Sequence, residues 1–193
     1  MNTIFWGMLA LAYLVGSVPF GVLVARTQQV DLRQNGSGNI GATNVYRVMG
    51  KGYGVLVFAL DFGKGLGVTV LAMHLFGEPW QHVLVGLTAI LGHSFSVFVR
   101  FRGGKGVATG IGVIAALSPL TCLIVLSVAA LMLKVTRIVS LTSMSGSVLV
   151  PVIMYLLDAP LAYVIMTAVI AVLLIIRHKD NIKRLLNGTE HQF

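Results

Sequence analysis

The stretch TIFWGMLALAYLVGSVPFGVLVA, residues 3–25, carries no charged side chain and is long enough to cross a lipid bilayer as a helix. A transmembrane helix needs about 20 predominantly apolar residues, and comparable stretches recur along the chain. Further spans are predicted at residues 53–76, 80–99, 106–118, 119–134, 138–157 and 160–177. The sequence therefore predicts an all-α membrane protein with seven transmembrane helices, in which a tight turn at Ser118-Pro119 separates the fourth from the fifth.

The composition agrees with a location in the membrane. Of the 193 residues, 56% are hydrophobic and only 10% are charged, whereas a soluble domain carries about 25% charged residues. Because the predicted spans fill most of the chain, we expect residues 1–193 to form a single integral membrane domain. We attribute the net charge of +8 to membrane topology and expect no nucleic-acid partner.

The positions of the basic residues predict the orientation of the chain. Cytoplasmic loops of membrane proteins are enriched in Lys and Arg. If the N-terminus lies outside, every Lys and Arg except Lys64 falls in a cytoplasmic connection, in the C-terminal tail or at a span end beside them. The outer turns carry Glu78 and Asp158 instead. We therefore predict an external N-terminus and a cytoplasmic C-terminus.

Several residues inside the predicted spans have expected structural roles. Pro19 should kink the first helix, with neighbouring groups satisfying the carbonyl that it frees. Asp61 and Lys64 lie one helical turn apart and should neutralise each other, although ionisable groups in lipid are also candidates for function. The glycines at 63 and 67 have the four-residue spacing that lets helices approach closely in lipid. His93, near the inner end of the third span, is a candidate to support a site.

The first of three polar segments on the predicted cytoplasmic side is RQNGSGNIGATNVYRVMGKGYG, residues 33–54. It is longer than a connection between helices requires, and a flexible linker is the alternative. Glycine permits positive φ angles and exposes backbone N–H groups, so such a loop can wrap closely around an anion. The candidate binding residues in it are Ser37, Gly38, Asn39, Asn44 and Arg47.

The second segment is RFRGGKGVATGIG, residues 100–112. Gly103, Gly104, Lys105 and Gly106 precede an apolar run, and a glycine turn that leads into a helix N-terminus suits a phosphate. Gly106 stands where a Walker A loop requires Ser or Thr after the lysine, which argues against nucleotide hydrolysis. The alternative is a basic anchor for lipid headgroups.

The third segment is the tail from residue 177 to residue 190. His178 and Asn181 are three residues apart and would share one face of a helix, and histidine titrates near neutral pH. On the same side of the membrane, Ser140, Thr142 and Ser143 open the sixth span. We expect them either to cap that helix or to donate hydrogen bonds into the site.

The chain lacks several familiar catalytic patterns. It has no Cys/His metal spacing, no carboxylate cluster and no G-x-S-x-G nucleophile motif, so we expect no metal and no cofactor. It also lacks the H-x-x-x-x-D pair of many acyltransferases that use acyl-CoA.

Four motifs resemble, in order, the bacterial membrane glycerol-3-phosphate acyltransferases that use acyl-phosphate as donor. They are GSVPFG, GSGNIGATNVYRVMGKGYG, HSFSVFVRFRGGKGVATGIG and HKDNIKRLLNGTE, which begin at residues 16, 36, 93 and 178. The resemblance covers nearly the whole chain. One departure is Ser96, where the family pattern leads us to expect proline.

The resemblance implies a reaction in phospholipid biosynthesis. An acyl group would pass from acyl-phosphate to the 1-hydroxyl of sn-glycerol 3-phosphate, giving lysophosphatidic acid and phosphate. The partners would be these two substrates and membrane lipid, with no protein partner required. The location would be the bacterial inner membrane, with the active site facing the cytoplasm.

Roles for the candidate residues follow as hypotheses. Residues 103–106 would hold the phosphate of glycerol 3-phosphate with help from Arg47, while the loop at residues 37–44 would hold the acyl-phosphate head and the developing oxyanion. His178 and Asn181 would orient the attacking hydroxyl or the leaving phosphate. Ser37 as an acyl-carrying nucleophile is a second choice, because no base can be assigned beside it.

Two other classes of function remain open at this point. A transporter of phosphate or an organophosphate would use similar loops, but it would be expected to show internal repeats and a site in the middle of the membrane. A structural membrane subunit with lipid-anchoring loops is the third alternative.

Overall fold

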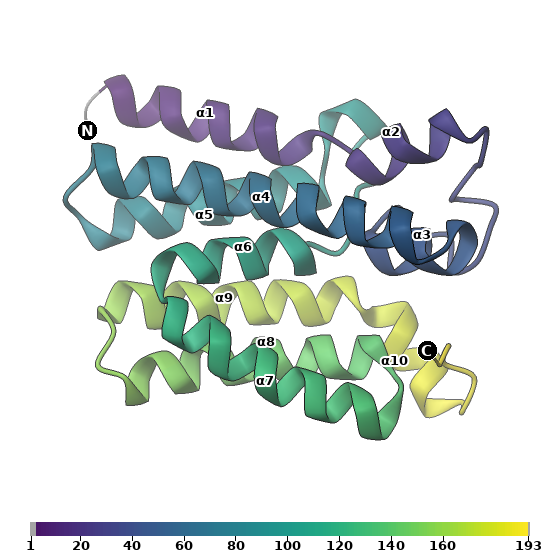
Figure 1. The fold of residues 1–193 in the computed structure, drawn as a ribbon. Coiled ribbons are helices and arrows are strands. Elements are labelled where there is room, and N and C mark those ends of the chain that lie inside the picture. The colour runs from purple at the N-terminus through teal and green to yellow at the C-terminus, as the bar shows by residue number, and fades with distance from the viewer. Residues whose placement is uncertain (1–2, 193) are drawn as a thin grey trace. The chain divides into compact units, whose positions relative to one another are not determined.

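The computed structural model describes residues 3–192, in which every regular element is a helix (Figure 1). The chain divides into two compact units between Ala116 and Leu117. The first unit contains α1 (Thr3–Ser17), α2 (Phe20–Thr27), α3 (Ala42–Met49), α4 (Lys51–Leu75), α5 (Pro79–Ser94), the 3₁₀ turn η1 (Val97–Val99) and α6 (Val107–Leu117), which ends at the boundary. The second unit contains α7 (Pro119–Thr136), α8 (Val139–Leu156), α9 (Leu161–Arg177) and α10 (Lys179–Leu186).

Five helical segments of residues 3–192 are long and apolar enough to cross a membrane: Thr3–Thr27, Lys51–Leu75, Pro79–Val99, Pro119–Thr136 and Val139–Leu156. Helices α9 and α10, which meet at 60°, make a sixth if they are counted as one span. The 11 residues of α6 rise only about 16 Å, whereas the hydrocarbon core is about 30 Å thick. An all-helical membrane protein is therefore confirmed, whereas seven spans and an external N-terminus stay predictions.

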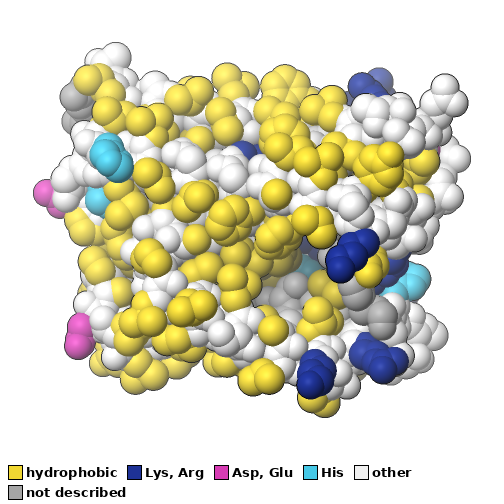
Figure 2. Space-filling view, viewed as in Figure 1, with side chains coloured by type: hydrophobic (Ala, Val, Ile, Leu, Met, Phe, Trp, Pro, Cys, Tyr) yellow, Lys and Arg dark blue, Asp and Glu magenta, His cyan; other side chains and the backbone are white. Residues whose placement is uncertain are grey.

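The surface of each unit has the character of a lipid-facing protein. Hydrophobic side chains cover most of the face shown in Figure 2, and large apolar residues on the spans, such as Trp6, Leu123 and Ile176, are more than half exposed. Within each unit, the acidic side chains on this face lie at the opposite end from most of the basic ones (Figure 2). This separation agrees with the charge bias of the sequence.

Two apolar clusters organise the first unit. One joins α1 to α4 and α5 through Phe5, Met8, Ala12, Val68, Ala72, Val85 and Ala89. The other joins α2, the polar loop, α3, α4 and η1 through Ala25, Leu32, Ile40, Val45, Val57 and Val99. The second cluster lies beneath the glycine-rich loop, so the loop is attached to a packed core and is not a free linker.

The predicted break at Pro19 is present and is satisfied by a neighbour. Helix α1 ends at Ser17 and α2 begins at Phe20. The ammonium of Lys64, on α4, donates a hydrogen bond of 2.9 Å to the carbonyl of Val18. Proline at position 19 frees the Val15 carbonyl, which accepts the N–H of Val18 (3.2 Å), and the Val18 carbonyl also accepts the N–H of Phe20 (3.1 Å). Carbonyls freed inside the membrane need such partners because no water is available there.

The close helix crossing in this unit uses glycines other than those predicted. A Cβ atom at Gly65 would collide with the carbonyl of Thr109 on α6, and one at Gly112 would collide with the carbonyl of Phe62 on α4. Positions 63 and 67 face open space. The expectation for Gly63 and Gly67 is therefore wrong, because α6 lies on the other face of α4.

The second unit shows the tight turns expected from its prolines. Helix α7 begins at Pro119, directly after the end of α6 at Leu117, so the predicted turn at Ser118-Pro119 is confirmed. Proline fits the first turn of a helix because its missing N–H would be unpaired there. The connection between α8 and α9 contains Asp158 with a φ of 53° and ends at Pro160.

Replacing Gly65 with alanine should lower the thermal unfolding midpoint of the protein in detergent by about 5 °C or more. The added methyl group would collide with backbone that cannot easily move, and such overpacking costs roughly 1–3 kcal/mol. Gly63→Ala is the matched control, because the same change two residues away meets open space. Equal midpoints for the two variants would contradict the close crossing of α4 and α6.

Candidate functional site

Asn44 closes the glycine-rich loop. Its side chain, in the first turn of α3, is 2% exposed. The amide oxygen accepts a hydrogen bond from the N–H of Ser37 (2.8 Å), and the amide nitrogen donates to the carbonyls of Leu32 (3.2 Å) and Asn35 (3.0 Å). Both N–H groups of the amide are thus used by the loop backbone. Asn44 therefore shapes the loop, and the direct contact with substrate expected from the sequence stays a prediction.

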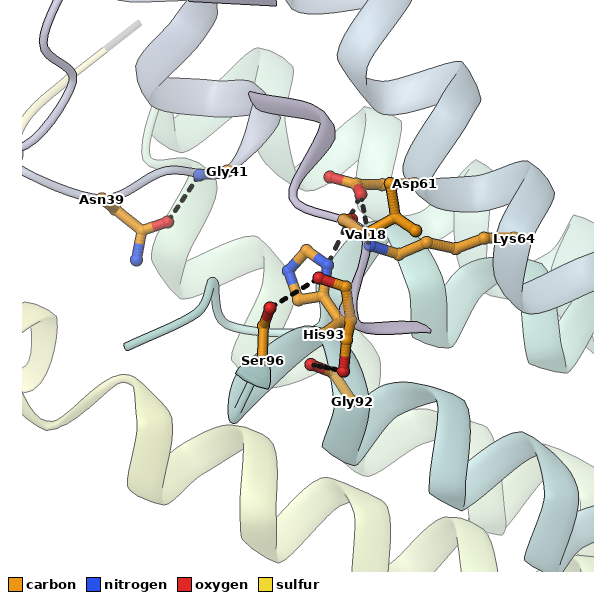
Figure 3. Close-up of polar contacts among 9 residues, drawn as sticks. Val18, Asn39, Gly41, Asp61, Lys64, Gly92, His93 and Ser96 are labelled. Atoms are coloured by element: carbon orange, nitrogen blue, oxygen red, sulfur yellow. Dashed lines mark hydrogen bonds and ion pairs between the residues drawn. The ribbon is translucent and has the colours of Figure 1, made fainter. Parts of the chain in front are cut away.

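The rest of the loop is held by backbone conformation and short local bonds. Gly36 and Gly38 have φ angles of 62° and 71°, which other residues adopt only with strain. The side-chain oxygen of Asn39 accepts a hydrogen bond of 2.8 Å from the N–H of Gly41 (Figure 3). Among residues 3–192, no hydrogen bond involves the Ser37 hydroxyl. This half-buried hydroxyl is therefore well suited to meet a ligand.

The glycine turn of the second segment folds back onto the end of α5. The N–H of Gly103 donates to the carbonyl of Ser94 (3.1 Å), and the N–H of Gly104 donates to the carbonyl of His93 (3.2 Å). A Cβ atom at either glycine would collide with His93. The two glycines therefore allow the turn to lie against α5, and their N–H groups form hydrogen bonds within the chain. Lys105 and Gly106, which lead into α6 at Val107, follow this anchored pair.

The structure joins the first polar segment to the residue directly before the second, within the first unit. The guanidinium of Arg33 donates a hydrogen bond of 3.3 Å to the carbonyl of Val99, and the Val99 side chain packs in the same cluster as Ile40 and Val45. Arg47 is half-buried on α3, one turn after Asn44. That these segments share a face of the membrane stays a prediction, and the contact at Val99 shows that their starts lie close together.

Asp61, Lys64 and His93 form a buried polar cluster in the first unit (Figure 3). The Lys64 ammonium lies 2.7 Å from Oδ1 of Asp61, which confirms the expected pairing. Nδ1 of His93 lies 3.5 Å from the same oxygen. The three residues are 2%, 6% and 8% exposed.

Ser96 accommodates the departure from the family pattern. Its φ angle is −65°, which is the value that a proline ring imposes. Its buried hydroxyl donates a hydrogen bond to the carbonyl of Ser17 at the end of α1 (Figure 3). The local backbone is thus the one that proline would require. Serine adds a hydrogen bond to the end of α1, next to the break in the first helix.

In the second unit, His178 and Asn181 lie where α9 gives way to α10. Both are buried, and Nδ1 of His178 forms a hydrogen bond of 2.8 Å with the carbonyl of Leu174. Asn181 donates a hydrogen bond of 2.6 Å to the carboxylate of Glu190. The predicted helix at this point is confirmed, although His178 stands at the bend before α10 rather than inside it.

Glu190 is the residue of this unit that sequence reasoning missed. Besides Asn181, its carboxylate accepts hydrogen bonds from Ser140 (2.9 Å) and from Nε of Arg184 (2.7 Å). Burial alone would raise the pKa of Glu190, but these hydrogen bonds and the Arg184 charge outweigh it and hold the pKa below its ordinary value. Its position at the end of the motif HKDNIKRLLNGTE was the one available signal.

The hydroxyl groups at the start of α8 do not cap that helix. Ser143 donates to the carbonyl of Val139 (2.8 Å) and Thr142 to that of Ile138 (3.0 Å). The capping expectation is therefore wrong, because both hydroxyls bond to carbonyls of the preceding turn. Substrate binding by Ser143 stays a prediction.

Glu190→Gln should destabilise the protein at pH 7, because removing a charged partner from buried donors costs about 1–3 kcal/mol. A carboxylate whose pKa is lowered in the folded state stabilises the protein above its unfolded pKa of about 4.3. That stabilisation is lost as the pH falls through the folded pKa. The difference in unfolding midpoint between wild type and variant should therefore shrink below about pH 4. Glu78→Gln, in an exposed turn, is the control. A difference in unfolding midpoint between wild type and Glu190→Gln that does not change with pH would contradict the charged network.

Comparisons with known proteins agree on one family. A family model described as glycerol-3-phosphate acyltransferase matches residues 6–188. A glycerol-3-phosphate acyltransferase of Aquifex aeolicus is 44% identical over 96% of this chain and 97% of its own length. One of Thermus thermophilus is 47% identical over 100% of this chain and 96% of its own.

Solved structures show the same likeness. The crystal structure of PlsY, an integral membrane glycerol 3-phosphate acyltransferase, in its glycerol 3-phosphate form matches with a TM-score of 0.95 and 44% identity. The lysophosphatidic acid form of PlsY matches with a TM-score of 0.93 and 43% identity. Each match covers 98% of this chain and 95% of the other.

Proposed function

Because the chain belongs to the glycerol-3-phosphate acyltransferase family, we propose that it transfers an acyl group from acyl-phosphate to the 1-hydroxyl of sn-glycerol 3-phosphate. The observation that carries this proposal is the full-length likeness to PlsY, whose glycerol 3-phosphate and lysophosphatidic acid forms correspond to acceptor and product of the reaction. The missing H-x-x-x-x-D pair favours acyl-phosphate over acyl-CoA as donor.

The protein would work as a multi-pass enzyme of the bacterial inner membrane, with the polar segments on the cytoplasmic side. The charge bias of the loops supports this orientation. A cytoplasmic site also fits the substrates, because glycerol 3-phosphate is a polar anion whereas acyl-phosphate carries a lipid chain. The whole chain would act as one integral membrane domain that needs no protein partner.

The phosphate of glycerol 3-phosphate would bind at Lys105 and Gly106, ahead of α6. The positive end of the helix dipole and the lysine charge both favour an anion there. Gly103 and Gly104 would hold the turn in shape through their bonds to α5. Arg47 would add a second positive charge.

The acyl-phosphate head would meet the loop around Ser37, Gly38 and Asn39, whose shape depends on Asn44. Donors fixed in place before the reaction stabilise a developing oxyanion without reorganising. His178, with its ring oriented by the Leu174 carbonyl, would orient the attacking hydroxyl or the leaving phosphate together with Asn181 and Ser143.

The reaction does not require a strong base from the protein. The 1-hydroxyl oxygen attacks the acyl carbon, the bond between that carbon and the phosphate oxygen breaks, and the hydroxyl proton passes to the departing phosphate. Acyl-phosphate is already activated, so no covalent enzyme intermediate is required. The work of the protein is to hold two phosphate-bearing substrates in register.

The transporter is not favoured, because the family and the solved relatives are acyltransferases. The same comparisons disfavour a purely structural subunit.

Lys105→Ala should raise the KM for glycerol 3-phosphate about 10- to 100-fold, the range expected when a charged hydrogen bond is lost. The KM for acyl-phosphate should change much less. Purified protein in lipid, assayed for phosphate release and lysophosphatidic acid, provides the measurement. Lys51→Ala, an exposed lysine at the start of α4, is the control. Wild-type protein that acylates glycerol 3-phosphate only from acyl-CoA would overturn the proposed donor.

Incubation with acyl-phosphate alone should leave the intact mass of the protein unchanged, because Ser37 is proposed to bind the donor and not to carry the acyl group. Ser37→Ala should lower kcat but leave a measurable rate. A hydroxylamine-sensitive acyl adduct in the wild type that is absent from Ser37→Ala would establish the covalent route instead.

A further inference from the structure

The buried cluster of Asp61, Lys64 and His93 has no task in the reaction described above. Ionisable groups inside a membrane protein are costly, and they are usually kept for a function. Stability alone is a weak reason to keep them, because a buried ion pair can often be replaced by apolar side chains at no loss of stability. The position of the cluster indicates what it does.

One side of the cluster supports the break in the first helix. Lys64 donates to the Val18 carbonyl (2.9 Å), and its ammonium lies 5.5 Å from the centre of the Phe20 ring. Beyond the break, a Cβ atom at Gly21 would collide with the carbonyl of Ile40. The polar loop that contains Ile40 therefore packs closely against the backbone that follows the break, where the Val18 carbonyl is also bonded by the N–H of Phe20 (3.1 Å).

The other side of the cluster supports the glycine turn. The carbonyl of His93 accepts the N–H of Gly104 at 3.2 Å. The ring of the same histidine lies so close to Gly104 that a Cβ atom there would collide with Nε2. Nδ1, on the other side of the ring, faces Asp61 at 3.5 Å (Figure 3). A rotation of this ring would push directly on the turn that precedes Lys105.

We propose that Asp61 is a positioning residue: its carboxylate, paired with Lys64, orients the His93 ring and thereby holds the turn of residues 103–106 in the shape that binds the phosphate of glycerol 3-phosphate. Neither Asp61 nor His93 touches the substrate in this role. The inference rests on the proposed function, because it assigns that turn to the acceptor. It predicts that loss of the cluster weakens acceptor binding selectively.

The test uses the full-length protein purified in lipid. Asp61→Asn alone would leave the Lys64 charge buried without its partner and could unfold the protein. The double variant Asp61→Leu/Lys64→Met removes both charges together. The Val18 carbonyl keeps the hydrogen bond of 3.1 Å that it accepts from the N–H of Phe20, so this variant should fold. Its KM for glycerol 3-phosphate should rise at least about tenfold, because a turn of altered shape would displace Lys105 from the phosphate and a lost charged hydrogen bond costs about that much. Its KM for acyl-phosphate should stay within about twofold. Thr69→Val, which removes a buried hydroxyl bonded to Gly65 on the same helix, is the matched control and should change neither KM.

A second readout does not depend on activity. In ¹⁵N spectra of the five histidines, His93→Gln identifies the signals of the His93 ring. The double variant should shift these signals and leave those of the other four histidines in place. Unchanged His93 signals would show that Asp61 does not orient the ring and would overturn the proposal.

The outcomes separate this inference from the proposed function. An active double variant with a wild-type KM for glycerol 3-phosphate but a lower unfolding midpoint would show that the cluster serves stability only. A wild-type protein that forms no lysophosphatidic acid would overturn the proposed function, and the assignment of this turn to the acceptor with it. A selective rise in the acceptor KM together with shifted His93 signals would support the positioning role.

Discussion

The break in the first helix beside Pro19 is the constraint around which the first unit is arranged. There the Val18 carbonyl accepts hydrogen bonds from the Lys64 ammonium (2.9 Å) and from the N–H of Phe20 (3.1 Å). A helix broken inside lipid exposes a carbonyl that water cannot reach, and leaving such a group unpaired costs several kcal/mol. An ammonium that satisfies the carbonyl is itself costly to bury, so it needs the carboxylate of Asp61 beside it. The break can then redirect the chain after α1, and the polar loop packs against α2 at Gly21. A local requirement for hydrogen bonding thus helps to determine where the glycine-rich loop lies.

Many polar groups of the two loops form hydrogen bonds within the chain that hold the loops in shape. Asn44 gives its amide to the backbone of residues 32–37, and the paired glycines give their N–H groups to the end of α5. A binding site gains from this arrangement, because donors already fixed in place lose little freedom when the ligand arrives. Polar residues in such a segment therefore fall into two groups, those that build the loop and those that face the ligand. Composition alone does not separate the groups.

The features that the sequence predicted correctly are those set by short-range rules. The break at Pro19, the turn at Ser118-Pro119 and the pairing of Asp61 with Lys64 each depend on residues within one or two turns of each other. The features that it missed depend on distant neighbours. The four-residue spacing of Gly63 and Gly67 indicated a helix face, but it could not show that α6 crosses the other face at Gly65. The role of Glu190 was hidden because one of its donors, Ser140, is 50 residues away in the sequence.

Asp61 and Glu190 share a physical requirement that follows from an anionic substrate. Two negative charges a few ångströms apart repel each other strongly in a medium of low dielectric constant, so an uncompensated carboxylate would oppose the binding of a phosphate. In the first unit the carboxylate of Asp61 is covered by Lys64 and His93. In the second, the carboxylate of Glu190 is covered by Asn181, Ser140 and Arg184. Each acid is thereby neutralised and at the same time fixes the side chains around it. In an enzyme for phosphate-bearing substrates, a buried carboxylate surrounded by donors is better understood as a support for the groups that bind than as an acid or base of the reaction.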